Sequence, residues 1–262
     1  METVLIEIMH YLYIFILVLV RVTALFILTP IFGTKNTPSM LKVGLGAIIA
    51  LIIVPTITGG EVYQSLSLIA YAGIVIREFL VGLLLGFVTY MAFIALYVAG
   101  QIIDMQMGFG IVSVIDPQSG EQIPVIANIY NIIALLLLLS LNGHHMIITS
   151  IFYSYHVLPV GMLSFTPYLL TNIVGIFTQM FILGFTVAAP VIAVLFLTNV
   201  LLGILAKTVP QMNVFVVGMP LKIAIGLLML AVLLPMFPII MDSIVNGMMN
   251  NLSTILKDMI LR

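Results

Sequence analysis

A long uncharged stretch sets the strongest limit on what this chain can fold into. Residues 122–206 contain no Asp, Glu, Lys or Arg. Such a stretch has room for several segments of the roughly 20 residues that a helix needs to cross the hydrocarbon core of a bilayer. Only 6% of all residues are charged and 63% are hydrophobic, against roughly a quarter and about half in a soluble domain. The sequence therefore predicts an all-α membrane protein.

About six hydrophobic helical segments are expected, because the apolar runs are separated by polar or Pro- and Gly-rich breaks. The runs cover 11–29, 43–57, 66–103, 123–142, 172–206 and 223–241. Two of them, 66–103 and 172–206, exceed the length of a simple span, so we expect them to kink or to return as hairpins.

The breaks between the runs include residues 142–167 and 207–220, where polar residues, Pro and Gly interrupt the apolar sequence. The mixed polar and apolar stretch from Asp242 to Arg262 predicts an amphipathic helix.

The few charges of the chain exclude some classes of function. The net charge is −1 and the eight basic residues are scattered, so no basic stripe is available for a nucleic acid. The basic residues also give no clear membrane orientation by the positive-inside rule. The absence of cysteine excludes disulfides and thiolate metal sites.

Four charged residues interrupt the apolar runs, namely Arg21, Arg77, Glu78 and Asp104. A charge at the bilayer centre costs from about 2.5 kcal/mol upward, so each of them is expected to have a partner or a wet cavity. Arg77 and Glu78 lie about 100° apart on a helix and are expected to face different neighbours. Helix docking is one role for these charges, and a proton or ion relay is the other, although the acids are isolated.

No enzyme active site and no cofactor are expected. His144 and His145 diverge on a helix, and no carboxylate lies within about twenty residues on either side, which argues against a metal site. An intramembrane aspartyl protease would need Asp104 to face Asp116. Asp116, however, precedes Pro117 in a glycine-containing stretch, which predicts a turn.

The stretch from Gln101 to Gly120 is apolar but has a composition that disfavours a helix, with Gly108, Gly110 and Asp116-Pro117. Non-helical backbone at membrane depth is tolerated where it is buried in protein or lines an aqueous path. This stretch could be an ordinary loop outside the membrane, or it could close such a path with apolar side chains. The candidate residues for a pore plug or seal are Met105, Met107, Phe109, Ile111, Val112, Ile115, Asp116 and Pro117.

Small residues predict one closely packed helix face. Gly82 and Gly86 are four residues apart in the third run, a spacing that lets helices approach closely.

The order of short motifs along residues 20–235 resembles the FliR family of the flagellar type III export gate. The motifs are Arg21-Val-Thr-Ala-Leu-Phe26 with Pro30 and Gly33, Arg77-Glu-Phe-Leu-Val-Gly82 with Gly86, Gly100-Gln-Ile-Ile-Asp-Met-Gln-Met-Gly-Phe109, Asp116-Pro117, Asn142-Gly-His144, Ala189-Pro190, Asn199, Leu202-Gly203, and Val209-Pro-Gln-Met-Asn-Val-Phe215 with Gly218 and Pro220-Leu-Lys222.

The resemblance implies a single FliR-like domain over residues 1–262 in a helical export-gate assembly. Residues 1–185 would form an approximate FliP-like part with a plug loop at about 106–122, and residues 186–262 an approximate FliQ-like part. The implied partners are FliP-like, FliQ-like and FlhB-like subunits, exported unfolded flagellar proteins and membrane lipid. The implied location is the flagellar basal body in the bacterial inner membrane.

The leading hypothesis is a non-enzymatic gate subunit that helps form and seal the conduit for exported flagellar proteins. Two alternatives remain open at this point: the homologous injectisome subunit, and a secondary transporter, for which Arg77, Glu78 and Asp104 would have to meet in one cavity. Lys222 lies beside an apolar run without a nearby acid in sequence, so we expect a partner subunit to supply its carboxylate or carbonyl acceptor.

Overall fold

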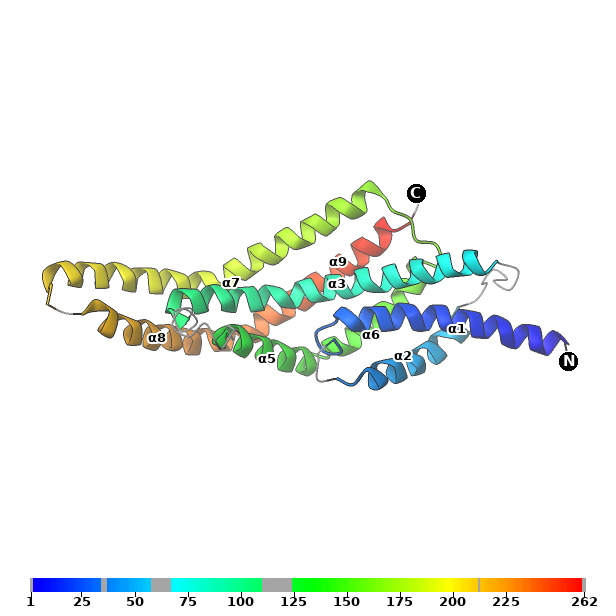
Figure 1. The fold of residues 1–262 in the computed structure, drawn as a ribbon, viewed down its shortest axis with the longest axis horizontal. Helices are drawn as coiled ribbons and strands as arrows, with labels where there is room; N and C mark the ends of the chain where they lie inside the picture. Colours follow the sequence, from blue (N-terminus) through cyan, green and yellow to red (C-terminus); the bar gives the residue numbers. More distant parts are fainter. Residues whose placement is uncertain (1, 34–36, 58–66, 110–123, 212, 261–262) are drawn as a thin grey trace. The chain divides into compact units, whose positions relative to one another are not determined.

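The computed structural model describes residues 2–33, 37–57, 67–109, 124–211 and 213–260 (Figure 1). Every regular element in these ranges is a helix, as the composition predicts. The elements are α1 (Glu2–Leu28), α2 (Ser39–Ile53), η1 (Val54–Thr56), α3 (Leu68–Met107), α5 (Val125–Ser140), α6 (Gly143–Val157), α7 (Pro167–Thr208), α8 (Val214–Leu233), η5 (Leu234–Met236) and α9 (Phe237–Asp258).

Within these ranges, five helical stretches are long and apolar enough to cross a membrane, and the bent pair α5 and α6 would be a sixth if it forms one span. The prediction of about six hydrophobic segments is thus confirmed. The helices α3 and α7 have 40 and 42 residues, which corresponds to about 60 Å each at 1.5 Å per residue. A hydrocarbon core is only about 30 Å thick, so each helix is too long for it even at a tilt of about 40°.

The two longest runs do not turn back on themselves. Each is one continuous helix, and α7 continues through Pro190. The hairpin instead joins α7 to α8, which return along each other in Figure 1. A Cβ atom added at Gly218 of α8 would lie 3.0 Å from the side chain of Leu202 on α7. The turn residues that permit a hairpin are therefore those after Thr208, where the apolar run ends.

The structure adds one helix that the sequence did not predict, α6, which lies in the expected break 142–167. Asn142 precedes it with a φ of 55°, a left-handed conformation that Asn tolerates. The helix buries one stripe at helical spacing, formed by Gly143, Ile147, Ser150, Ile151 and Ser154. The hydroxyl groups of the two serines donate to the carbonyls of residues 147 and 151, so they have hydrogen-bond partners within the helix.

The C-terminal stretch is the amphipathic helix that the sequence predicts, although α9 begins earlier, at Phe237. Its apolar residues are buried in a stripe that includes Met241, Ile244, Met248 and Leu252. The end of α9 is tied to the α6–α7 connection, because Thr166 Oγ1 donates to the Asp258 carbonyl at 2.7 Å.

The chain forms two compact units. Unit 1 comprises residues 1–91, 142–176 and 245–262, and unit 2 comprises residues 92–141 and 177–244. In unit 1, α2 lies alongside α1 (Figure 1), and the fully buried side chains include Leu17, Val22, Phe26, Ile53 and Leu85. The core of unit 2 is the cluster of Ala99, Ile103, Met107, Ile126, Tyr130, Ala188, Val191, Leu195 and Phe237.

Both units interleave segments from along the chain, so they do not correspond to the proposed FliP-like and FliQ-like parts. Packing within one chain does not report on which parts share ancestry. The division at residues 185 and 186 therefore stays a prediction.

Candidate functional site

Two charged residues of unit 1, Arg21 and Glu78, meet in one buried cluster. Arg21 on α1 donates from Nε to Glu78 Oε2 at 2.7 Å and from Nη2 to Oε1 at 3.0 Å. Both side chains are only 1% exposed. Two parallel bonds between a guanidinium and a carboxylate fix the geometry as well as the charge balance, so this pair joins α1 to α3 in one arrangement.

Further groups of α6 and the following turn accept two more hydrogen bonds from Arg21. Arg21 Nη1 donates to Ser154 Oγ at 3.1 Å and to the Leu158 carbonyl at 3.2 Å. The guanidinium carbon also lies 3.9 Å from the ring centroid of Tyr155, within the range of a cation–π interaction. Burying an ion pair is tolerable when its remaining protons and lone pairs find partners, and Arg21 donates four hydrogen bonds in this cluster, whereas the buried hydroxyl group of Tyr155 has no partner among the described residues.

Glu78 and its neighbour Arg77 also hold the connection between α6 and α7. The Gly161 N–H donates to Glu78 Oε1 at 2.8 Å, and Arg77 Nη1 donates to the Gly161 carbonyl at 3.0 Å. Gly161 has a φ of 78°, which glycine adopts at little cost. Arg77 and Glu78 thus do not pair with each other, but they share Gly161 as a neighbour, while Arg21 contacts Glu78.

The two glycines singled out from the sequence lie where α3 crosses α1. A Cβ atom added at Gly82 would overlap the carbonyl oxygen of Arg21, and one added at Gly86 would lie 2.8 Å from the carbonyl oxygen of Leu25. Real Cβ atoms do not come this close to a backbone oxygen. The absence of side chains at these positions is what lets α1 and α3 pack backbone against backbone.

In unit 2, Asp104 lies near the end of α3 and contacts the start of α5. Its carboxylate accepts the backbone N–H of Ile126 at 3.0 and 3.1 Å and that of Ala127 at 3.1 Å. Among the described contacts of Asp104 no cation occurs. This buried carboxylate is therefore balanced by the N-terminus of a helix, where backbone N–H groups favour negative charge.

The candidate seal residues fall into three groups. Met105 and Met107 lie in the last turns of α3, because the helix continues to Met107 and ends only at Gly108. The expectation that they belong to a loop is corrected here: Met105 is 75% exposed, whereas Met107 is fully buried. Phe109 packs against the core cluster of unit 2. The others lie outside the described residues, namely Ile111, Val112, Ile115, Asp116 and Pro117.

Lys222 lies on α8, beyond Pro220, and is partly exposed. The described part of the chain offers no hydrogen-bond or ion-pair partner to its ammonium group. The same helix carries the exposed apolar side chains of Leu221 and Val217. Pairing with another subunit therefore stays a prediction for Lys222.

Some contact residues were missed by sequence analysis. Ser154, Leu158 and Gly161 fall in the break 142–167 between the apolar runs, and no local pattern marks them as neighbours of Arg21 and Glu78. Gly100 was singled out in the sequence only as the first residue of one motif. A Cβ atom there would overlap the backbone of Ala127, so Gly100 is the place where α3 and α5 meet.

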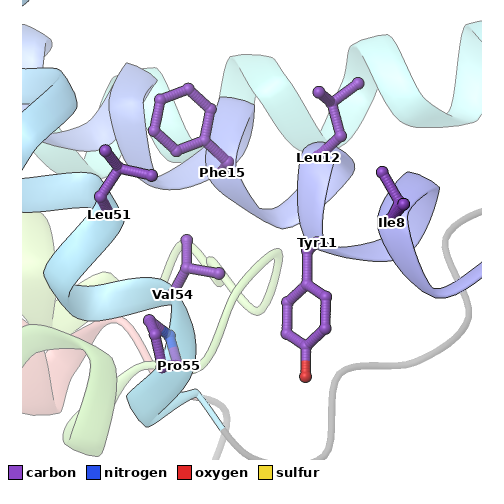
Figure 2. A pocket seen from close by; sticks show the side chains of 7 residues that line it. All are labelled: Ile8, Tyr11, Leu12, Phe15, Leu51, Val54 and Pro55. Atoms are coloured by element: carbon purple, nitrogen blue, oxygen red, sulfur yellow. The ribbon is translucent and has the colours of Figure 1, made fainter.

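An apolar groove lies on unit 1, between α1 and the end of α2 (Figure 2). Its volume is about 510 Å³, and it is lined by Ile8, Tyr11, Leu12, Phe15, Leu51, Val54 and Pro55. In Figure 2 the hydroxyl group of Tyr11 is the only side-chain heteroatom among the labelled side chains. Such a lining can hold apolar groups, but it supplies no acid–base pair for chemistry.

The comparisons with known proteins agree with the motif order. A profile of the family "Bacterial export proteins, family 1" matches residues 12–248. The flagellar biosynthetic protein FliR of Bacillus subtilis (strain 168) is 42% identical over 228 residues, which are 83% of this chain and 85% of that protein. FliR of Escherichia coli (strain K12) is 32% identical over 243 residues, 92% of each chain. FliR of Aquifex aeolicus (strain VF5) is 30% identical over 227 residues, 85% of this chain and 86% of that protein.

These matches confirm the resemblance drawn from the motifs. Because both the family profile and the relatives cover most of the sequence, the chain belongs to family 1 of the bacterial export proteins, the family of the flagellar biosynthetic protein FliR.

Proposed function

We propose that this protein is a non-enzymatic core subunit of the flagellar type III protein export gate, where it helps to form and seal the conduit for unfolded flagellar proteins. The observation that carries the proposal is the alignment with flagellar biosynthetic proteins over most of both chains. The membrane-type helices agree with a site in the bacterial inner membrane, at the flagellar basal body.

The buried charges favour a scaffold over a transporter. Glu78 is occupied by Arg21 and Gly161, and Asp104 is occupied by the backbone of α5. A proton or ion relay needs acids that can exchange their partners. Carboxylates that are fixed by two or three hydrogen bonds are suited to hold helices together instead.

FliP-like, FliQ-like and FlhB-like subunits are the proposed partners. Support for partner helices comes from the outward faces of α7 and α8, which carry exposed apolar side chains such as Phe196, Leu197, Leu201, Leu228 and Val232. A face of this kind needs either lipid or apolar helices against it. The contacts of Gly82 and Gly86 with the backbone of α1 show how closely two helices of this chain pack where one of them carries glycine.

The proposed seal is the apolar segment that follows Met107. An apolar constriction excludes ions because water leaves it, so no charged filter is required. Met107 belongs to the core of unit 2 and Phe109 packs against it, so both would anchor this segment. Ile111, Val112 and Ile115 would supply its apolar bulk.

Complementation tests the function most directly. Expression of this chain in Bacillus subtilis without its own FliR should restore flagellar protein export and motility, and the chain should co-purify with FliP-like and FliQ-like subunits after mild solubilisation. A stable complex that restores no flagellar export would favour the injectisome alternative. A chain that stays alone and transports a solute after reconstitution would favour the transporter.

The seal is tested separately. Replacing Ile111 and Val112 together by Ser should leave the complex assembled and should raise the ion conductance of membranes that carry it. If the variant complex assembles and its ion conductance is unchanged, the assignment of this segment as the seal is wrong, whereas the family assignment still holds.

A further inference from the structure

Helix α5 begins without a cap of its own. The residue at its N-cap position is Pro124, whose side chain makes no capping hydrogen bond, and the first turn contains no acidic residue. The first backbone N–H groups of any helix lack partners within that helix. In a buried setting each unsatisfied group is costly, so the start of α5 needs an acceptor from elsewhere in the chain.

Asp104 supplies this acceptor from 22 residues upstream. Its two carboxylate oxygens take three hydrogen bonds from the N–H groups of Ile126 and Ala127, at 3.0 to 3.1 Å. The side chain is only 5% exposed. Hydrogen bonds to an ionised acceptor are stronger than neutral ones, and the negative charge is favoured by the helix dipole of α5.

The backbone of the same residue takes part in the end of α3. The Gly108 N–H donates to the Asp104 carbonyl at 3.2 Å, and Gly108 has a φ of 94°. A left-handed glycine bonded back to the last turn is a common way to end a helix. The carbonyl of Asp104 therefore accepts a hydrogen bond at the C-terminus of α3, and its carboxylate caps the N-terminus of α5.

Packing contacts before and after Asp104 support the same arrangement of α3 and α5. At Gly100, one turn before Asp104, the backbones of α3 and α5 touch, because an added Cβ atom would lie 2.6 Å from the Ala127 nitrogen. One turn after Asp104, Met107 is fully buried, and its sulfur would lie 2.8 Å from a Cβ atom at Gly226 of α8. The carboxylate thus lies between a close backbone contact at Gly100 and a buried side chain at Met107.

We propose that Asp104 is a positioning residue: by capping α5 from the last turn of α3, it fixes the residues at both ends of the connection between these helices, including Met107 and Phe109. The inference rests on the proposed function only for its effect on export. The capping itself is a property of unit 2 and can be measured without reference to the conduit.

Three variants of the assembled complex test the proposal. Asp104→Leu keeps the approximate shape and removes both acceptor oxygens, whereas Asp104→Asn keeps one acceptor oxygen. Gln106→Leu is the matched control, because Gln106 lies on the same turn with an exposed side chain. The readouts are the yield of the complex, the hydrogen exchange of the Ile126 and Ala127 amides, and the ion conductance.

We expect Asp104→Leu to assemble, to exchange the two amides faster by about tenfold or more, and to leak. Asp104→Asn should lie between Asp104→Leu and the wild type in both readouts, and Gln106→Leu should match the wild type. Unchanged exchange in Asp104→Leu would overturn the capping role. Failure of both Asp104 variants to assemble would reduce the residue to a requirement of folding and would also overturn the proposal.

The failure of this inference can be told apart from the failure of the proposed seal. Ile111→Ser combined with Val112→Ser tests the seal without touching the cap. If that variant leaks while Asp104→Leu exchanges its amides fast but stays tight, the positioning role is wrong and the seal stands. If the Ser variant stays tight while Asp104→Leu shows fast exchange, the cap stands and the seal is wrong.

Discussion

The two units of this chain stabilise a buried carboxylate in different ways. In unit 1, Glu78 is paired with the guanidinium of Arg21, and further acceptors from α6 and the turn after it complete the cluster. In unit 2, Asp104 has only backbone N–H groups as its described partners. A charge in an apolar chain can thus be balanced by a counter-charge or by a helix terminus.

The difference predicts how each site responds to mutation. Removing one member of the ion pair leaves the other charge buried without a partner. Removing Asp104 leaves only backbone groups without an acceptor, a smaller loss.

Glu78→Gln should be the most damaging of these changes, because it leaves the Arg21 guanidinium buried without a counter-charge. Breaking such a pair costs about 3–5 kcal/mol, so we expect poor assembly and a strongly lowered midpoint of thermal denaturation in detergent. The double variant Arg21→Met with Glu78→Met should lose less than Glu78→Gln alone, since no charge is stranded. A double variant that is as unstable as the single one would show that the cluster acts through shape and not through charge.

Gly82→Ala should destabilise unit 1 by about 1–3 kcal/mol, the usual cost of forcing atoms into a filled space. The obstacle is the backbone oxygen of Arg21, which cannot rotate away. Gly44→Ala is the control: nothing lies within 4 Å of a Cβ atom there, and Ala is the better helix former. Thermal denaturation of the purified complex measures both. Equal midpoints for the two variants would remove the claim that Gly82 marks a closely packed crossing.

Asp104→Asn should cost about 0.5–2 kcal/mol, the range found for losing a helix cap. It should therefore be milder than Glu78→Gln, although both replace a buried carboxylate by an amide. The comparison is made by denaturing the two variants under identical conditions. If Asp104→Asn proves the more severe change, the helix terminus contributes more than the counter-charge, and the contrast between the units is reversed.

Lys222→Met should have the smallest effect on the isolated chain, because its ammonium has no acceptor among the described residues. The same change should weaken the assembled complex if a partner subunit supplies a carboxylate or carbonyl oxygen. Yield of the isolated chain and of the complex, measured in parallel, separates the two situations. A complex that assembles normally with Met at this position would contradict the inter-subunit role, whereas Lys222→Arg serves as the charge-preserving control.

Long apolar runs and glycine spacing predicted most of the local structure. The run at 11–29 lies in α1 up to Leu28, and the run at 66–103 overlaps α3 from Leu68 onward, because an apolar run of that length with so few charges has no stable alternative to a helix in lipid. The helix α6 was missed because its sequence mixes polar and apolar residues. Its helical state depends on burying one face against the rest of unit 1. Met107 was predicted to lie in a loop, because the glycines that follow it suggested that the helix ends before this residue.

The sequence by itself determined the class of the protein, its helix content and its family, since these follow from local composition and from the order of motifs. It also marked Arg21, Glu78 and Asp104 as charges that need partners. Only the tertiary structure decided which partners these are. Glu78 meets a residue 57 positions earlier, and Asp104 caps a helix 22 positions later. Contacts at such separations depend on how helices pack in three dimensions, and local patterns carry no record of that packing.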